Sequence, residues 1–159
     1  IVTRCTRGRI ARRAVDWQVL VVIGASFGIG TALQTTGAAQ TIAASLIALT
    51  GATPLYALAS IYLVTAVFSA VITNTVAAVV MFPIALAAAD TLHVSFMPFA
   101  ITIMMAASAS FATPIGYQTN LMVYGVGGYR FTDYLRMGVP LTFLVGLVTV
   151  LLAPLWWPF

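Results

Sequence analysis

The stretch 17–89 contains no charged side chain, which constrains the fold of this chain more than any other feature of its sequence. A water-soluble domain of this size would need many more charges to cover its surface. The whole chain is 62% hydrophobic and only 6% charged, so lipid must face much of it. The sequence therefore predicts an all-α membrane protein.

The positive charge of the chain is concentrated at one end. Five of its seven arginines lie within 4–13, directly before an apolar segment that begins at Trp17. Nucleic-acid binding is one reading of such a cluster, but arginines beside a membrane segment favour a cytoplasmic flank under the positive-inside rule. We therefore predict a cytoplasmic basic linker at 1–16 and no nucleic-acid partner. Because the chain begins at Ile1, we also expect it to be a piece of a longer protein.

Segment lengths predict which parts cross the membrane. The stretch 17–33 is close to the length needed to span hydrocarbon, whereas 38–49 is too short and should lie along the interface. Together they define 17–50 as a crossing helix followed by an interfacial arm. A last crossing is predicted at 137–157, ending in two tryptophans at a water interface.

The remainder, 51–159, contains two interrupted apolar segments. The first, 55–89, consists of two pieces on either side of a polar triplet, and the second piece, 76–89, has only 14 residues. Because neither piece needs to cross alone, we predict a re-entrant hairpin with its tip inside the membrane. The second segment, 96–125, is predicted to be a helix broken at 112–120, where Pro114 and Gly116 occur. This layout places Arg130 and Arg136 on the cytoplasmic side.

Polar side chains gather at both interruptions. Irregular backbone and polar groups at membrane depth are tolerated where they are buried in protein or line a water-filled cavity. Half-helix N-termini attract anions, and unwound carbonyls can coordinate a cation such as sodium. The alternative is that these side chains only form hydrogen bonds between packed helices. Paired interruptions favour a transporter site, with these candidate residues: Thr73, Asn74, Thr75, Thr113, Pro114, Thr119 and Asn120.

Other functions fit the sequence less well. A membrane enzyme needs a catalytic base or a metal cluster at membrane depth, and one histidine with three aspartates near segment ends supplies neither, so we predict no enzyme and no cofactor. A non-transporting assembly subunit would not need paired interruptions. A related arsenite or sodium/proton type of ion transporter shares the general architecture and stays an alternative.

The motif "ITNTVAAVVMFPIA" resembles the Ser-Asn-Thr hairpin tip of the divalent anion:sodium symporters, a citrate-transporter-like family. "SASFATPIGYQTNLMVYGVGGYRFTDYLRMGVP" is similar to the C-terminal repeat of the same family, and the resemblance covers about 14–157. It implies half of an inverted-repeat elevator transporter in the cell's inner membrane. The substrate would be a di- or tricarboxylate or sulfate, with sodium as coupling ion. The implied partners are membrane lipids, a missing N-terminal half and, at full length, a second copy in a homodimer.

The resemblance also implies roles for individual residues. Thr73, Asn74 and Thr75 match the tip that contacts substrate and shapes one sodium site. The unwound segment opposite is matched by Ala112, Thr113 and Pro114. Sodium would be held by Thr73, Asn74 and Thr113. Two departures are a threonine at 73 where serine is usual, and "GYQTN" after Thr113-Pro114. The sequence "GGYRFTDYLR" is similar to members that carry cytoplasmic regulatory domains of the potassium-uptake type.

Overall fold

The computed structural model describes residues 17–51 and 53–159; the predicted linker at 1–16 lies outside this part. All regular secondary structure in the described residues is helical, which confirms the predicted fold class at that level. Seven helices follow one another: α2 (Trp17–Thr35), α3 (Ala38–Thr50), α4 (Pro54–Val71), α5 (Asn74–Leu92), α6 (Met97–Ser108), α7 (Gln118–Val126) and α8 (Phe131–Trp156).

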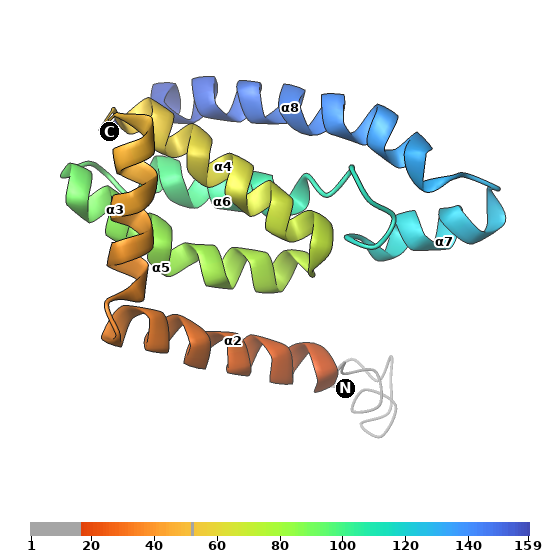
Figure 1. Cartoon of the computed structure of the whole chain (residues 1–159), viewed down its shortest axis with the longest axis horizontal. Coiled ribbons are helices and arrows are strands. Elements are labelled where there is room, and N and C mark those ends of the chain that lie inside the picture. Colours follow the sequence, from red (N-terminus) through yellow and green to blue (C-terminus); the bar gives the residue numbers. More distant parts are fainter. Residues whose placement is uncertain (1–16, 52) are drawn as a thin grey trace, which may run out of the picture.

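Helix α3 lies across the direction of the other long helices (Figure 1). Gly37 before it and Gly51 after it have φ angles of 73° and 77°. Glycine adopts this left-handed conformation without the steric cost that a Cβ adds, so the chain can turn sharply at both ends of α3. The bounds of α3 agree with the predicted arm at 38–49, while its position at a membrane interface stays a prediction.

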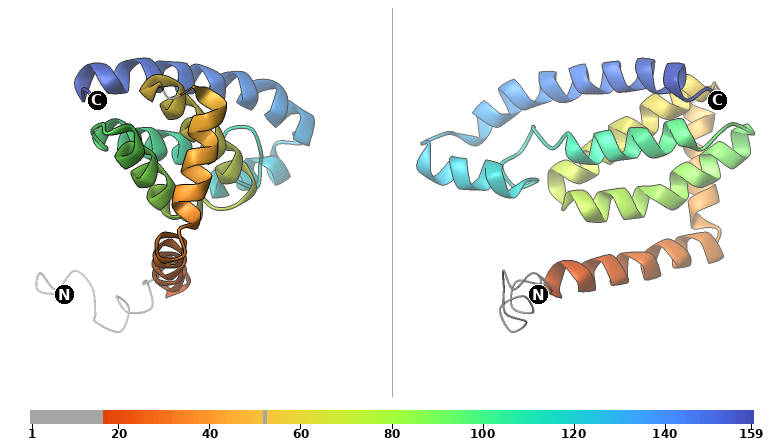
Figure 2. Two further views of the ribbon diagram at one scale, coloured as in Figure 1. Left: turned by 60° about the vertical axis from the view of Figure 1, so that its left-hand side comes forward. Right: turned by 180° about the vertical axis from the view of Figure 1, so that it is seen from behind.

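Helices α4 and α5 form an antiparallel hairpin, and α6 packs against both of them (Figures 1 and 2). Their shared core is fully buried and combines large apolar side chains with several alanines of α5. Small residues let helix backbones approach closely, which suits packing in a membrane, where lipid competes for apolar surface. The largest core residues are Leu58, Ile61, Met81, Ile84 and Phe99.

The second arm of the hairpin is longer than the sequence indicated. Helix α5 has 19 residues and continues through Pro83 to Leu92, where His93 ends it with a φ of 54°. Asp90, which follows the predicted arm at 76–89, therefore lies in the last turn of α5. By length and composition α4, α5 and α8 can each cross a membrane. The argument that the hairpin arms are too short to cross the membrane is therefore wrong for α5. A re-entrant hairpin must be argued from other observations.

Helix α8 packs through a face of small residues. These residues are three or four positions apart, which places them on one side of the helix. They are Gly138, Thr142, Gly146, Thr149 and Ala153. Gly146 faces the ring of Tyr62 in α4, whose hydroxyl donates a hydrogen bond to the carbonyl of Thr142 at 2.9 Å. This face holds α8 against α4, α6 and the segment that follows α6.

Helix α8 also begins six residues before the predicted start at 137. The carboxylate of Asp133 accepts a hydrogen bond from the backbone N–H of Arg130 at 2.8 Å, which stabilises the first turn. The first residue of α8 and the first residue of α2 lie on the same side of the molecule (Figure 1). The membrane side of Arg130 and Arg136 stays a prediction.

Candidate functional site

Four helix ends meet where the hairpin tip lies against the interruption between α6 and α7. They are the C-terminal ends of α4 and α6 and the N-terminal ends of α5 and α7 (Figures 1 and 2). The helix predicted at 96–125 is indeed broken, but the non-helical segment is 109–117 and not 112–120. Thr119 and Asn120 consequently lie in the first turn of α7.

Asn74 connects the tip to both sides of this break. With its side-chain nitrogen turned toward the available acceptors, the amide donates to Ser69 Oγ at 2.9 Å, to the Ala107 carbonyl at 3.2 Å and to the Gly116 carbonyl at 3.1 Å. Ser69 Oγ in turn donates to the same Ala107 carbonyl at 2.5 Å. These acceptors belong to the end of α4, the end of α6 and the segment before α7. One side chain thus contacts three parts of the chain.

Two hydroxyls of the break bind the last turn of α4. Ser110 Oγ donates to the Ser69 carbonyl at 3.0 Å, and Thr113 Oγ1 donates to the Ala70 carbonyl at 2.6 Å. The last carbonyls of a helix lack partners within that helix, so these hydroxyls replace the missing backbone donors. Ser69 and Ser110 are only 0% and 2% exposed, so water does not compete for the bond between them.

Asn120 folds back from α7 onto the break. Its side-chain nitrogen donates to the Ser110 carbonyl at 3.0 Å and to the Thr113 carbonyl at 3.3 Å. Its own backbone carbonyl accepts a hydrogen bond from the Tyr134 hydroxyl at 2.9 Å. Asn120 therefore ties the break to α8 as well. We call the group formed by Ser69, Asn74, Ser110, Thr113, Gly116 and Asn120 the polar junction.

The predicted site residues divide into two groups. Asn74, Thr113 and Asn120 come together in the polar junction, and Pro114 is buried beside them. The side chains of Thr73, Thr75 and Thr119 are exposed. The sequence predictions missed Ser69 and assigned no site role to Ser110 or Gly116. Ser69 lies one helical turn before the triplet, and its position near that tip was the available signal.

The N-terminal ends of α5 and α7 lack side-chain caps. Thr73 precedes α5 and Tyr117 precedes α7, and neither side chain caps the helix it precedes. The first N–H groups of a helix have no partner within it and attract negative charge. The contact between Asn74 and the Gly116 carbonyl brings the two ends together, and they point toward each other (Figure 1). The arrangement can bind an anion.

The C-terminal ends of α4 and α6 offer oxygen ligands at the same junction. The backbone carbonyls of α4 and α6 point into the polar junction, and the Thr73 hydroxyl is exposed beside it. Oxygen atoms of this kind suit a hard cation such as sodium. Within residues 17–51 and 53–159, no three His, Cys, Asp or Glu side chains gather to hold a metal ion.

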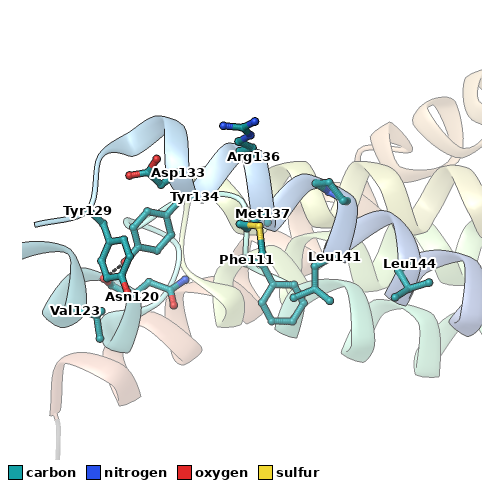
Figure 3. A pocket seen from close by; sticks show the side chains of 12 residues that line it. Phe111, Asn120, Val123, Tyr129, Asp133, Tyr134, Arg136, Met137, Leu141 and Leu144 are labelled. Atoms are coloured by element: carbon teal, nitrogen blue, oxygen red, sulfur yellow. Dashed lines mark hydrogen bonds between the residues drawn. The ribbon is translucent and has the colours of Figure 1, made fainter. Parts of the chain in front are cut away.

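A cavity of about 650 Å³ lies beside the polar junction, between α7 and the first half of α8 (Figure 3). It shares Asn120 with the junction, and most of its other walls are apolar. The Arg136 side chain points away from Phe111 and Leu141, so its charge lies at the rim (Figure 3). The cavity borders the candidate site and does not contain the triplet. Its lining residues are Phe111, Asn120, Val123, Tyr129, Asp133, Tyr134, Arg136, Met137, Gly138, Pro140, Leu141 and Leu144.

Helices able to span a membrane and a hairpin tip that meets a broken helix are features of membrane transport proteins. The chain belongs to the citrate transporter family, whose pattern matches residues 1–159. This match shows that the chain belongs to a family of transporters and not of enzymes.

Individual relatives agree with this assignment. The uncharacterized transporter YfbS of Escherichia coli is 38% identical over 98% of this chain, as is the uncharacterized transporter sll0640 of Synechocystis. Sodium/sulfate cotransporter 1 of Chlamydomonas reinhardtii is 38% identical over 88% of the chain. The chain spans 26% of the length of the first two relatives and 16% of the third.

Proposed function

We propose that this chain is the C-terminal part of a secondary active transporter for small anions, with sodium as the coupling ion. The observation that carries the proposal is the meeting of two uncapped helix N-termini at the polar junction. Each N-terminus carries about half a positive charge, so two of them favour a small oxyanion without a fixed cationic side chain. A tri- or dicarboxylate and sulfate both meet this description.

Sodium coupling rests on the oxygen atoms of the junction. Sodium would be held by Thr73, Asn74 and Thr113 together with the adjoining carbonyls. The Thr113 hydroxyl donates to the Ala70 carbonyl and accepts from the Gly116 N–H at 3.2 Å, so one oxygen lone pair remains for a cation. The Chlamydomonas relatives named sodium/sulfate cotransporters support this ion and an inorganic anion. Asp90 and Asp133 are both exposed, and neither lies in the junction as a proton carrier would.

The position of the junction along α8 supports a re-entrant hairpin. Helix α8 has 26 residues and is therefore about 39 Å long, enough to cross the hydrocarbon core. It meets the break at Gly138 and Thr142, which lie about 10 and 16 Å from its first residue. The hairpin tip contacts the same break, so it lies well inside any membrane that α8 spans. Both arms then return to the side where α8 ends.

The rest of the proposed transporter follows from the length of the relatives. We propose that 17–50 supplies a scaffold helix and an interfacial arm, and that 51–159 is part of a moving transport domain. The other inverted repeat would complete the anion site in an elevator mechanism, in a homodimer within the inner membrane. A cytoplasmic regulatory domain would precede residue 17, as the resemblance of "GGYRFTDYLR" implies.

The function is tested with the full transporter polypeptide in proteoliposomes. We expect saturable uptake of labelled sulfate or citrate that requires an inward sodium gradient, because the anion and sodium share one junction. An equal potassium gradient is the control. Uptake driven equally by both gradients would contradict sodium coupling, and uptake of neither anion would contradict the substrate class.

Labelling of a cysteine at the tip tests whether the triplet lines an aqueous site. In a Cys5→Ser background, Thr73→Cys should react with a small water-soluble thiol reagent, because Thr73 is exposed beside the polar junction. We expect sodium and substrate together to slow the labelling reaction about tenfold or more. This factor lies within the range by which one bound ligand commonly changes the affinity for another. Ser95→Cys, exposed in the loop between α5 and α6, is the control and should not respond to substrate. Equal protection at both positions would contradict the assignment.

A further inference from the structure

We propose that Ser110 is a positioning residue for anion binding, acting without contact to the anion. Its hydroxyl holds the break against the last turn of α4, so that the N-termini of α5 and α7 keep the spacing that one anion requires. This inference rests on the proposed function, because it concerns the same site.

The bond from Ser110 joins two segments that are far apart in the sequence. Ser110 Oγ donates to the Ser69 carbonyl, and 41 residues separate these partners. The hydroxyl oxygen of Ser69 accepts a hydrogen bond from the side-chain amide of Asn74, the first residue of α5. Asn120, in the first turn of α7, donates to the carbonyl of Ser110. Ser110 therefore lies on a chain of hydrogen bonds that runs from the start of α5 to the start of α7.

The packing around Ser110 leaves no room for adjustment on one side. A Cβ added to Gly116 would lie 1.9 Å from Ser110 Oγ and 2.7 Å from the Ser69 carbonyl oxygen. Real Cβ atoms do not approach other atoms so closely, so the residue that precedes the α7 cap must be glycine for this bond to form. The backbone at 116 can consequently approach α4 and place its own carbonyl 3.1 Å from the Asn74 amide.

The burial of Ser110 separates positioning from substrate contact. Ser110 is 2% exposed, so its side chain does not line the surface that an anion reaches. Without the hydroxyl, the Ser69 carbonyl loses its donor and the break can move away from α4. Only the fraction of molecules with both N-termini in place then binds the anion, and the apparent affinity falls by that fraction.

The test compares Ser110→Ala with Ser108→Ala in the full transporter polypeptide. Ser108 ends α6 two residues earlier and is exposed, so it matches Ser110 in chemistry and location but not in burial. The readout is the half-saturation concentration for sulfate or citrate at saturating sodium, together with the thermal unfolding midpoint. We expect Ser110→Ala to raise the half-saturation concentration about five- to tenfold, the effect of losing one buried hydrogen bond, and Ser108→Ala to leave it unchanged.

A purely structural role would lower the unfolding midpoint of Ser110→Ala without changing its half-saturation concentration, and that result would overturn the inference. An equal change in Ser108→Ala would overturn it too. Ser110→Cys retains a weaker donor and should give an intermediate value. If Ser110→Ala does not fold, parent-like half-saturation in Ser110→Cys overturns the inference. Failure of the parent itself to take up either anion would instead count against the proposed function.

Discussion

Asn74→Ala should reduce anion transport at least about tenfold and also lower the thermal stability of the transporter. The Asn74 amide donates to acceptors at the ends of α4 and α6 and before α7. Truncation leaves the buried Ser69 Oγ and the Gly116 carbonyl without this donor, which costs roughly 1–3 kcal/mol, while the Ala107 carbonyl keeps the Ser69 hydroxyl as its donor. It also frees the start of α5, one of the two helix ends assigned to the anion. Initial uptake rates in proteoliposomes and thermal unfolding of the purified protein measure the two effects.

Two further variants identify the cause of that loss. Asn74→Asp keeps the shape of the side chain but removes the N–H donors and adds negative charge beside the proposed anion site. We expect it to transport no better than Asn74→Ala. Thr75→Ala removes a polar group from the next position of α5, where the side chain is exposed, and should leave folding intact. Parent-like uptake by Asn74→Ala at limiting sodium would show that this residue is not part of the site.

Gly138→Ala should destabilise the contact between α8 and the break. An added Cβ at this position would lie 2.1 Å from the Phe111 carbonyl oxygen and 2.7 Å from the Ala112 Cα. Both atoms belong to the backbone, so no flexible side chain can move aside. Overpacking of this kind typically costs about 1–3 kcal/mol. We therefore expect a lower unfolding midpoint, with weaker transport because Phe111 and Ala112 belong to the interruption.

Gly125→Ala provides the matched control for Gly138→Ala. An added Cβ at Gly125 meets no atom within 4 Å, and the residue lies within α7. Replacing glycine with alanine in an exposed helix commonly stabilises by about 0.5–1 kcal/mol. We therefore expect the control to be neutral or slightly stabilised. Equal unfolding midpoints for the two variants would mean that α8 can shift along the break without cost.

Much of the fold follows from the sequence. The lack of charge at 17–89 indicates that lipid surrounds this part of the chain. Because lipid offers no hydrogen bonds to the backbone, a spanning segment must form them internally, as a helix does. Glycine and proline located most helix ends to within a few residues, as they did for α3. The sequence also identified Asn74 and Thr113 as candidate site residues, because each is a polar residue at an interruption of an apolar segment.

Helix ends were harder to predict where a helix continues beyond its apolar stretch. The sequence pattern placed the end of the second hairpin arm before Asp90, yet α5 continues to Leu92. It also placed the start of α8 at 137, whereas the bond between Asp133 and the Arg130 N–H starts the helix at Phe131. A charged residue interrupts an apolar run but does not interrupt a helix, so hydropathy gave the wrong ends.

Only the tertiary structure decided which polar groups meet. The hydroxyls of Ser69, Ser110 and Thr113 bind carbonyls that are 38 to 43 residues away in the sequence. No local periodicity encodes such pairs, because they depend on how α4, α6 and the break pack together. The sequence by itself determined that buried polar groups would need partners, since an unpaired group in lipid is costly. The packing of the helices determines which groups become those partners. It also leaves the N-termini of α5 and α7 without side-chain caps.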